Sequence, residues 1–297
     1  MKRHQLKCTG QIVYNFKGEF HSKPKTIFDK LEEPGIHVQY RVYPWFVVYD
    51  FEVMLVPIRE SNSTKLTWTQ RHEPISVSVC SNVDGFTEPH CIVEPEVETL
   101  VRKMVEYMTR FALRSYELAQ QKFADAFAQL DADINNPMRA PLEDDDDDDY
   151  KLNTFLDDDE LQEEKNVFKK LKEELDAYCR QTIVLWINSA KYDMNFVKAH
   201  LAKQLDMHGP GETFNVKRNN SYAYLANDTF KMLDVTSYMS PGVSYDKFLK
   251  AFEVAENKGY FPYEWLDDVD KLNHPNLPSH EDFYSSLKDC NISPEEY

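Results

Sequence analysis

The chain has 297 residues, which allows one large domain or two ordinary domains with full hydrophobic cores, and we expect one main domain with an insertion. No apolar run approaches the ~20 residues needed to span a bilayer, and the N-terminus MKRHQLKCTG lacks the apolar stretch of a signal peptide. These features predict an intracellular protein that is not secreted and has no membrane partner, and they leave the nucleus and the mitochondrion both open. The five cysteines form no C-x-x-C pair, which argues against a zinc knuckle or a disulfide framework.

The net charge of −17 argues at first against a nucleic-acid partner, because binding to the phosphate backbone normally depends on Lys and Arg. The acidic residues are concentrated in one segment. Residues 143–164 contain 13 acidic residues and one lysine, so the rest of the chain carries a net charge of only −5. Residues 143–149 have no apolar side chain with which to enter a core, and we expect 133–160 to be an acidic, disordered linker.

Hydrophobic patterns predict an α/β domain that opens with an antiparallel meander. Residues 44–57 (PWFVVYDFEVMLVP) form an apolar, β-branched and aromatic run typical of a buried central strand. A second strand is expected at 75–80, with the turn between the two strands at 70–74. The remaining patterns predict helices at 95–130, 161–178, 194–205, 244–256 and 281–288, and strands at 182–187, 214–216, 222–225 and 230–233.

The first candidate site is the pair Asp50 and Glu52 in the predicted central strand. Alternate side chains of a strand share a face, so both carboxylates point the same way while Phe51 packs opposite. Two adjacent carboxylates on a buried strand repel each other, and a divalent cation such as Mg²⁺ or Mn²⁺ relieves this repulsion. The ordinary alternative is two carboxylates at a solvated strand end, because D-x-E also occurs by chance. The apolar residues on both sides favour a site.

The second candidate site is the segment N-S-A-K-Y-D at residues 188–193, directly after the predicted strand 182–187. A carboxylate at a strand-to-helix junction is where α/β domains commonly place site residues. Asp193 therefore becomes a candidate ligand. The alternative for Asp193 is simple capping of the following helix.

Together the two segments resemble the first two exonuclease motifs, D-x-E and N-x₂₋₃-(F/Y)-D, of family B DNA polymerases of the organellar, viral and Maverick/Polinton transposon type, which are protein-primed. The resemblance implies a 3′→5′ proofreading exonuclease with an RNase H-like fold, a mixed central sheet flanked by helices. It also implies that Asp50, Glu52 and Asp193 bind two Mg²⁺ or Mn²⁺ ions at the 3′ end of single-stranded DNA. Asn188 and Tyr192 would position the terminal nucleotide, and simple packing is the alternative for Tyr192.

The similarity extends from about Tyr43 to Tyr297, through TWTQRHEPISVSVCSNV, LDVTSYMSPGVSYDKFLKAF, KGYFPYEWLDDV and EDFYSSLKDCNISPEEY. Within it, Ser244, Tyr245 and Phe248 resemble the (S/T)-L-x-x-h motif that contacts single-stranded DNA and the terminal protein, although Tyr245 replaces the usual leucine. This assignment divides the chain into an N-terminal extension (1–42), a first part of the exonuclease domain (43–132), the acidic linker (133–160) and a second part (161–297).

The third motif of the family, Y-x-x-x-D, is expected beyond Tyr297, together with the polymerase domain. Without its tyrosine and aspartate we expect the chain alone to cleave DNA slowly or not at all. Asp267, Asp268 and Asp282 are the nearest other aspartates, and none of them is assigned to a Y-x-x-x-D motif. The rival hypotheses are a non-catalytic remnant that binds single strands or a protein partner, and an unrelated RNase H-like nuclease. His72 stands in the similar segment without an evident partner, and a structural role is favoured for it.

Overall fold

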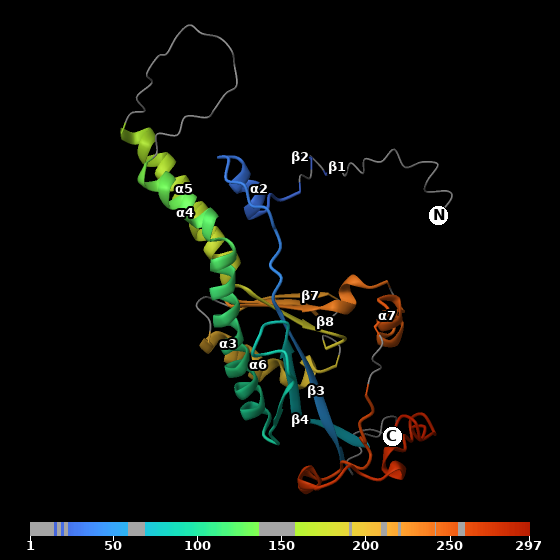
Figure 1. Ribbon diagram of the computed structural model, residues 1–297. Helices are drawn as coiled ribbons and strands as arrows, with labels where there is room; N and C mark the ends of the chain where they lie inside the picture. The colour runs from blue at the N-terminus through green and yellow to red at the C-terminus, as the bar shows by residue number, and fades with distance from the viewer. Residues whose placement is uncertain are drawn as a thin grey trace, which may run out of the picture. The chain divides into compact units, whose positions relative to one another are not determined.

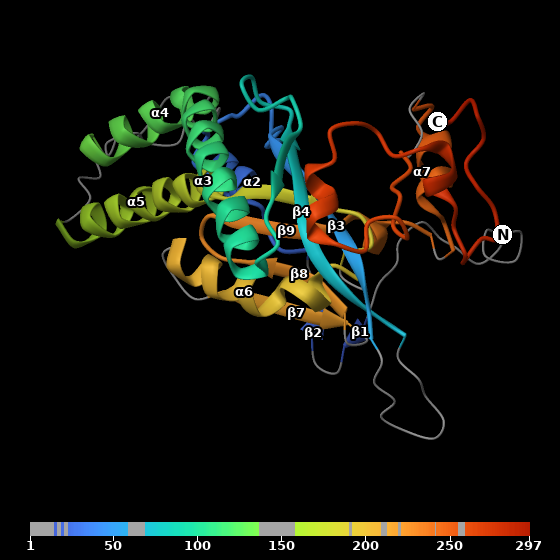
Figure 2. The same ribbon diagram turned by 90° about the horizontal axis from the view of Figure 1, so that it is seen from below.

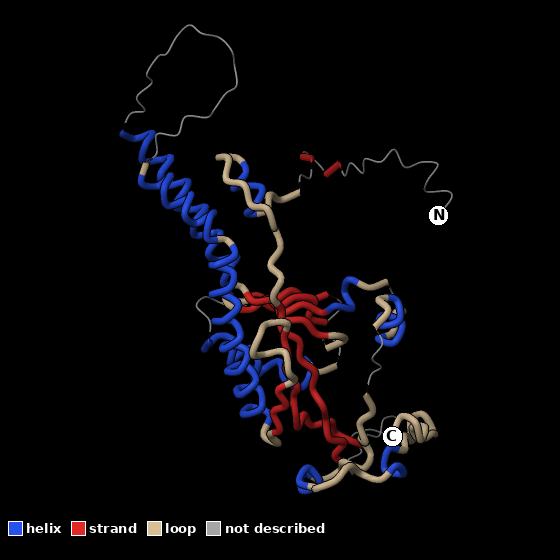
Figure 3. Tube along the Cα trace, viewed as in Figure 1, coloured by secondary structure: helices blue, strands red, loops and turns tan. Residues whose placement is uncertain are grey.

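The computed structural model describes residues 15–16, 19–20, 23–58, 69–136, 158–189, 192–208, 213–218, 221–240, 242–254 and 259–297. The chain divides into two compact units. The helical unit comprises Met1–Val42 and Phe123–Tyr178, and the sheet unit comprises Tyr43–Lys122 and Cys179–Tyr297. One seven-strand mixed sheet packed against helices confirms the predicted α/β class (Figures 1 and 3).

The strands of the sheet unit are β3 (Phe46–Pro57), β4 (Gln70–Ser81), β5 (His90–Val93), β6 (Thr182–Trp186), β7 (Phe214–Arg218), β8 (Ser221–Ala226) and β9 (Phe230–Asp234). Its helices are α3 (Val97–Lys122), α6 (Met194–His208) and α7 (Tyr245–Ala251), with the 3₁₀ helices η1 (Val235–Tyr238), η2 (Val269–Asn273) and η3 (His280–Phe283). The helical unit contains β1 (Asn15–Phe16), β2 (Glu19–Phe20), α2 (Ile27–Glu32), α4 (Ala124–Asn135) and α5 (Asp158–Arg180) up to Tyr178. None of the helices in the described part of the chain combines the length and the apolar character that crossing a bilayer requires.

The strand order of the sheet is β5-β4-β3-β6-β9-β8-β7. Strands β3, β4 and β5 pair antiparallel, which confirms the predicted opening meander. Strands β3, β6 and β9 run parallel to one another, and the hairpin of β8 and β7 continues the sheet antiparallel. The carboxyl ends of three parallel strands therefore meet along one edge of the sheet.

A bulge interrupts the pairing of β3 with β4 and corrects one prediction. The register shifts between Glu52 and Val53, where Glu52 pairs with Ser76 but Val53 pairs with Pro74. The predicted turn at 70–74 is wrong, because these residues begin β4. Pro74 lies at the bulge, a position where a missing backbone N–H is tolerated. The connection between the strands passes through residues 59–68, which lie outside the described residues.

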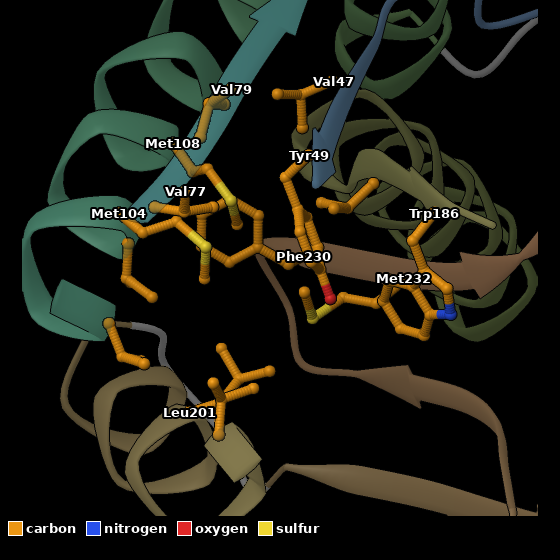
Figure 4. Packing of buried hydrophobic residues seen from close by; sticks show 14 of the residues in the cluster. Val47, Tyr49, Val77, Val79, Met104, Met108, Trp186, Leu201, Phe230 and Met232 are labelled. Carbon is orange, nitrogen blue, oxygen red and sulfur yellow. The ribbon is translucent and has the colours of Figure 1, made fainter. Parts of the chain in front are cut away.

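The main core lies between one face of the sheet and the helices α3 and α6, which lie side by side (Figure 2). In β3 the odd-numbered residues Val47, Tyr49 and Phe51 are buried, and they face this core. Met104 and Met108 of α3 and Leu201 of α6 meet them, and Phe230 and Met232 enter from β9 (Figure 4). The even-numbered residues of β3 up to Glu52 lie on the opposite face, which is called here the open face.

The helical unit has its own apolar contacts. A capping box between Thr26 and Asp29 starts α2. The Phe28 ring then packs against the rings of Phe123 and Tyr178, with centroid distances of 5.6 and 5.0 Å. Aromatic rings at these separations add about 0.5–1.5 kcal/mol per pair beyond the area that they bury.

Several boundaries differ from the sequence prediction. Helix α7 stops at Ala251, five residues early, and the left-handed conformation of Glu253 (φ 55°) follows its end. The predicted helix 281–288 is wrong. Only η3 forms there, because Leu287 is 94 % exposed and offers no buried apolar stripe. The outer ends of the predicted acidic linker are helical, while residues 137–157 lie outside the described residues.

Candidate functional site

The two carboxylates of the D-x-E segment lie on the open face of β3, the third strand of the sheet. Asp50 is exposed and Glu52 is half-buried. Their cross-strand neighbours on β4 are Ser78 and Ser76. The expectation that both carboxylates lie on a buried strand is therefore wrong for Asp50. Its strand is central, but the face that carries it is open to solvent, so the hydration cost of its charge is smaller than expected.

The second segment follows β6 at the sheet edge where the parallel strands end. Asn188 adopts a left-handed conformation with φ 60°, which asparagine tolerates better than most residues. Ser189 accepts backbone hydrogen bonds from Tyr192 (3.1 Å) and Met194 (3.0 Å), which close the turn into α6. Asp193 is buried, 7 % exposed, and its carbonyl accepts the N–H groups at the start of α6. Residues 190 and 191 lie outside the described residues.

Tyr49 marks the point where the two segments approach each other. Val48 pairs with Leu185, so Asp50, two residues further on, is level with the end of β6. Burial raises the pKa of Tyr49, and the charges of Asp193, Asp234 and Asp50 raise it further. The charges of three carboxylates from three parts of the chain therefore reach the buried Tyr49 hydroxyl and raise its pKa.

Asp234, at the end of β9, is a site residue that the sequence analysis did not single out. Its side chain is fully buried (0 % exposed). Oδ1 accepts hydrogen bonds from Asn188 N (3.2 Å), Thr236 N (2.9 Å) and Thr236 Oγ1 (2.5 Å). This side chain therefore ties the loop after β6 to the turn after β9. The pattern of an aspartate at a strand end with a threonine two residues later is typical of such a turn and could have indicated it.

Tyr192 is held among aromatic side chains. Its hydroxyl hydrogen-bonds with Nδ1 of His72, and its ring contacts His72 and Phe196 at centroid distances of 5.7 and 5.1 Å. Burial raises the pKa of Tyr192, as do the nearby charges of Asp193 and Glu52. The ring is nevertheless 38 % exposed. The structure thus gives His72 the partner that the sequence did not reveal, and it places Tyr192 near carboxylates of both segments.

Tyr263 reaches the site from the C-terminal part of the chain. Its hydroxyl donates a hydrogen bond to Glu52 Oε2 at 2.7 Å. Burial raises the pKa of Tyr263, and this hydrogen bond and the charges of Glu52 and Asp50 raise it further. Tyr263 and Asp267 do have Y-x-x-x-D spacing, contrary to the sequence analysis. The tyrosine hydrogen-bonds to Glu52, whereas the Asp267 carboxylate forms an ion pair with Lys271 at 2.6 Å.

The third predicted group, Ser244, Tyr245 and Phe248, belongs to α7 and its start. The Ser244 hydroxyl caps the helix by accepting the Lys247 N–H at 3.3 Å. The Phe248 ring packs on Phe252 with a centroid distance of 4.8 Å, and Tyr245 is 38 % exposed. The helical cap accounts for Ser244 without a ligand, whereas Tyr245 remains accessible.

The chemistry of the carboxylates fits a divalent cation. They offer hard oxygen donors, the type that Mg²⁺ and Mn²⁺ prefer. Within the described ranges, no group of three or more His, Cys, Asp or Glu side chains is arranged to hold a metal ion. Mg²⁺ commonly uses only one or two carboxylates together with waters and substrate phosphates. Asp50 and Glu52 are therefore the residues that would hold it first.

Comparisons with known proteins identify no relative, since no family model, no curated protein and no solved structure matches the chain.

Proposed function

We propose that the chain is the 3′→5′ exonuclease region of a family B DNA polymerase of the protein-primed type, and that it removes nucleotides from single-stranded DNA. One observation carries the proposal. Asp50 and Glu52 lie on the open face of β3, at the edge where Asp193 and Asp234 follow the neighbouring parallel strands. Open α/β sheets bind their ligands at this edge. The mixed sheet with helices packed against it supports the RNase H-like form of the fold.

In this proposal Asp50, Glu52 and Asp193 hold two Mg²⁺ or Mn²⁺ ions. Such cations activate water and stabilise the leaving oxygen of a phosphodiester. The half-exposed ring of Tyr192 offers a stacking surface for the terminal base, which suits binding without sequence preference. The exposed side chain of Asn188, on the same loop, offers an amide to the terminal nucleotide.

The proposal also implies partners. Single-stranded DNA with a free 3′ end is the substrate, and the polymerase domain and a terminal protein are the protein partners. Helix α7, with the exposed Tyr245, would contact the strand or the terminal protein. The negative charge of the chain predicts that this binding depends more on stacking and on cations than on Lys and Arg.

A second candidate is a non-catalytic remnant that binds single strands or a protein partner. It is favoured by the exposure of Asp50 and by the lack, within the described residues, of a ready group of three metal ligands. Such a protein would keep the aromatic surface around Tyr192 without needing the carboxylates.

Digestion of single-stranded DNA labelled at its 3′ end separates the two candidates. We expect slow, Mg²⁺-dependent release of the labelled nucleotide, abolished by Asp50→Ala. The matched control is Asp84→Ala, which removes an exposed aspartate in the turn between β4 and β5 and should leave the rate unchanged. Binding without cleavage in either Mg²⁺ or Mn²⁺ would instead leave the remnant standing.

A further inference from the structure

The hydrogen bond from Tyr263 to Glu52 joins residues 211 positions apart in the chain. At 2.7 Å it has the length of a charge-assisted hydrogen bond, which is stronger than one between neutral groups. It occupies one carboxylate oxygen of the D-x-E pair.

Apolar packing fixes the segment that carries Tyr263. Leu266 is buried with Met54 and Ile75. Phe261 and Trp265, on either side of Tyr263, pack against the same cluster. Met54 lies two residues after Glu52 on β3, so the segment is anchored beside the carboxylate that Tyr263 contacts. The orange-red segment that carries Tyr263 lies against the long β3–β4 pair in Figure 1.

Polar contacts also hold the segment that carries Tyr263. Lys271 Nζ donates to the carbonyl of Trp265 at 2.7 Å and lies 5.4 Å from the centre of its ring. Lys271 also pairs with Asp267. The Phe261 ring packs on the Tyr263 ring with a centroid distance of 4.8 Å. These contacts hold the backbone around Tyr263 in place. The Tyr263 hydroxyl therefore has a fixed position beside Glu52.

We propose that Tyr263 is a positioning residue for Glu52, and that the segment from Phe261 to Leu266 is a built-in part of the cation site. The inference rests on the proposed function, because it assigns Glu52 to a cation. Carboxylates that bind metals are generally held by a hydrogen bond from a neighbouring group, and loss of that group typically costs 10–100-fold in metal affinity or activity. The Tyr263 hydroxyl gives Glu52 such a hydrogen bond. It holds the Glu52 carboxylate in place although the charge of Asp50 repels it.

The test is Mn²⁺ binding to the full chain, measured from the electron paramagnetic resonance signal of free Mn²⁺, with no DNA present. Tyr263→Phe keeps the ring and its packing and removes only the hydroxyl. We expect it to bind Mn²⁺ about 10–100-fold more weakly than the wild type, at an unchanged melting temperature. The matched control is Tyr284→Phe, which removes an equivalent 2.7 Å hydrogen bond from a tyrosine to the carboxylate of Asp289 and leaves the hydrogen bond from Tyr263 to Glu52 in place. This variant should bind Mn²⁺ like the wild type.

Glu52→Gln separates failure of this inference from failure of the proposed function. If Glu52→Gln weakens Mn²⁺ binding while Tyr263→Phe does not, the role of Tyr263 is wrong and the cation site stands. Tighter binding by Tyr263→Phe would also overturn the inference, because the hydroxyl would then be competing with the cation. If the wild type and Glu52→Gln bind Mn²⁺ equally, or neither binds it, both proposals fail.

Discussion

Replacing Asp234 with alanine should lower the free energy of unfolding by about 3–5 kcal/mol, because three donors lose the acceptor that they share. The side chain is fully buried, and its Oδ1 accepts three hydrogen bonds, from Asn188 N and from the backbone and hydroxyl of Thr236. A buried donor left without an acceptor costs about 1–3 kcal/mol, and these three partly buried donors fall toward the lower end of that range. For a domain of about 150–250 residues, each kcal/mol lowers the melting temperature by roughly 2–4 °C, so a fall of about 6–20 °C is expected.

Thermal unfolding followed by circular dichroism measures this loss. Asp234→Asn keeps an acceptor oxygen and should lose about half as much stability. Asp228→Ala is the matched control, because Asp228 is exposed in the β8–β9 connection, where substitutions usually change stability by about 0.5 kcal/mol or less. If Asp234→Ala were as stable as this control, the hydrogen bonds of Asp234 would not stabilise the loops after β6 and β9.

Two further predictions test the core and the start of α3. Phe111 of α3 is fully buried in the main core, so Phe111→Ala should cost about 3–5 kcal/mol in denaturant unfolding. A loss below about 1 kcal/mol would contradict the described core. The Glu96 carboxylate accepts hydrogen bonds from Thr99 and Glu98, which lower its pKa. Its stabilisation is therefore present above the unfolded-state pKa and is lost as the pH falls through the lower folded-state value. The wild type should lose more stability than Glu96→Gln between pH 6 and pH 3, and equal losses would contradict the capping role.

Local pattern was enough to predict the elements that build the site. The continuous apolar run around Asp50 predicted β3, and the two-residue period of a strand placed Asp50 and Glu52 on one face. The switch to helical spacing after Asp193 predicted α6. These predictions depend on near neighbours in the chain, and the sheet confirms both elements.

The parts that sequence could not give depend on remote contacts or on one-residue irregularities. The bulge at Glu52 draws Pro74 into β4, which no propensity at residues 70–74 indicates. The Tyr263 hydroxyl meets Glu52 only because Leu266 and Met54 are buried together. The importance of Asp234 likewise follows from the approach of the Asn188 loop, 46 residues earlier in the chain.

The most direct test of the central claim is the direction of digestion on single-stranded DNA labelled at its 5′ end. If the D-x-E carboxylates form a 3′→5′ exonuclease site, the wild type in Mg²⁺ should give a ladder of labelled products that shorten from the 3′ end one nucleotide at a time. Asp50→Ala should give no ladder at all. A protein that releases the 5′ label first, or that cuts this DNA equally well after Asp50→Ala, would contradict the account.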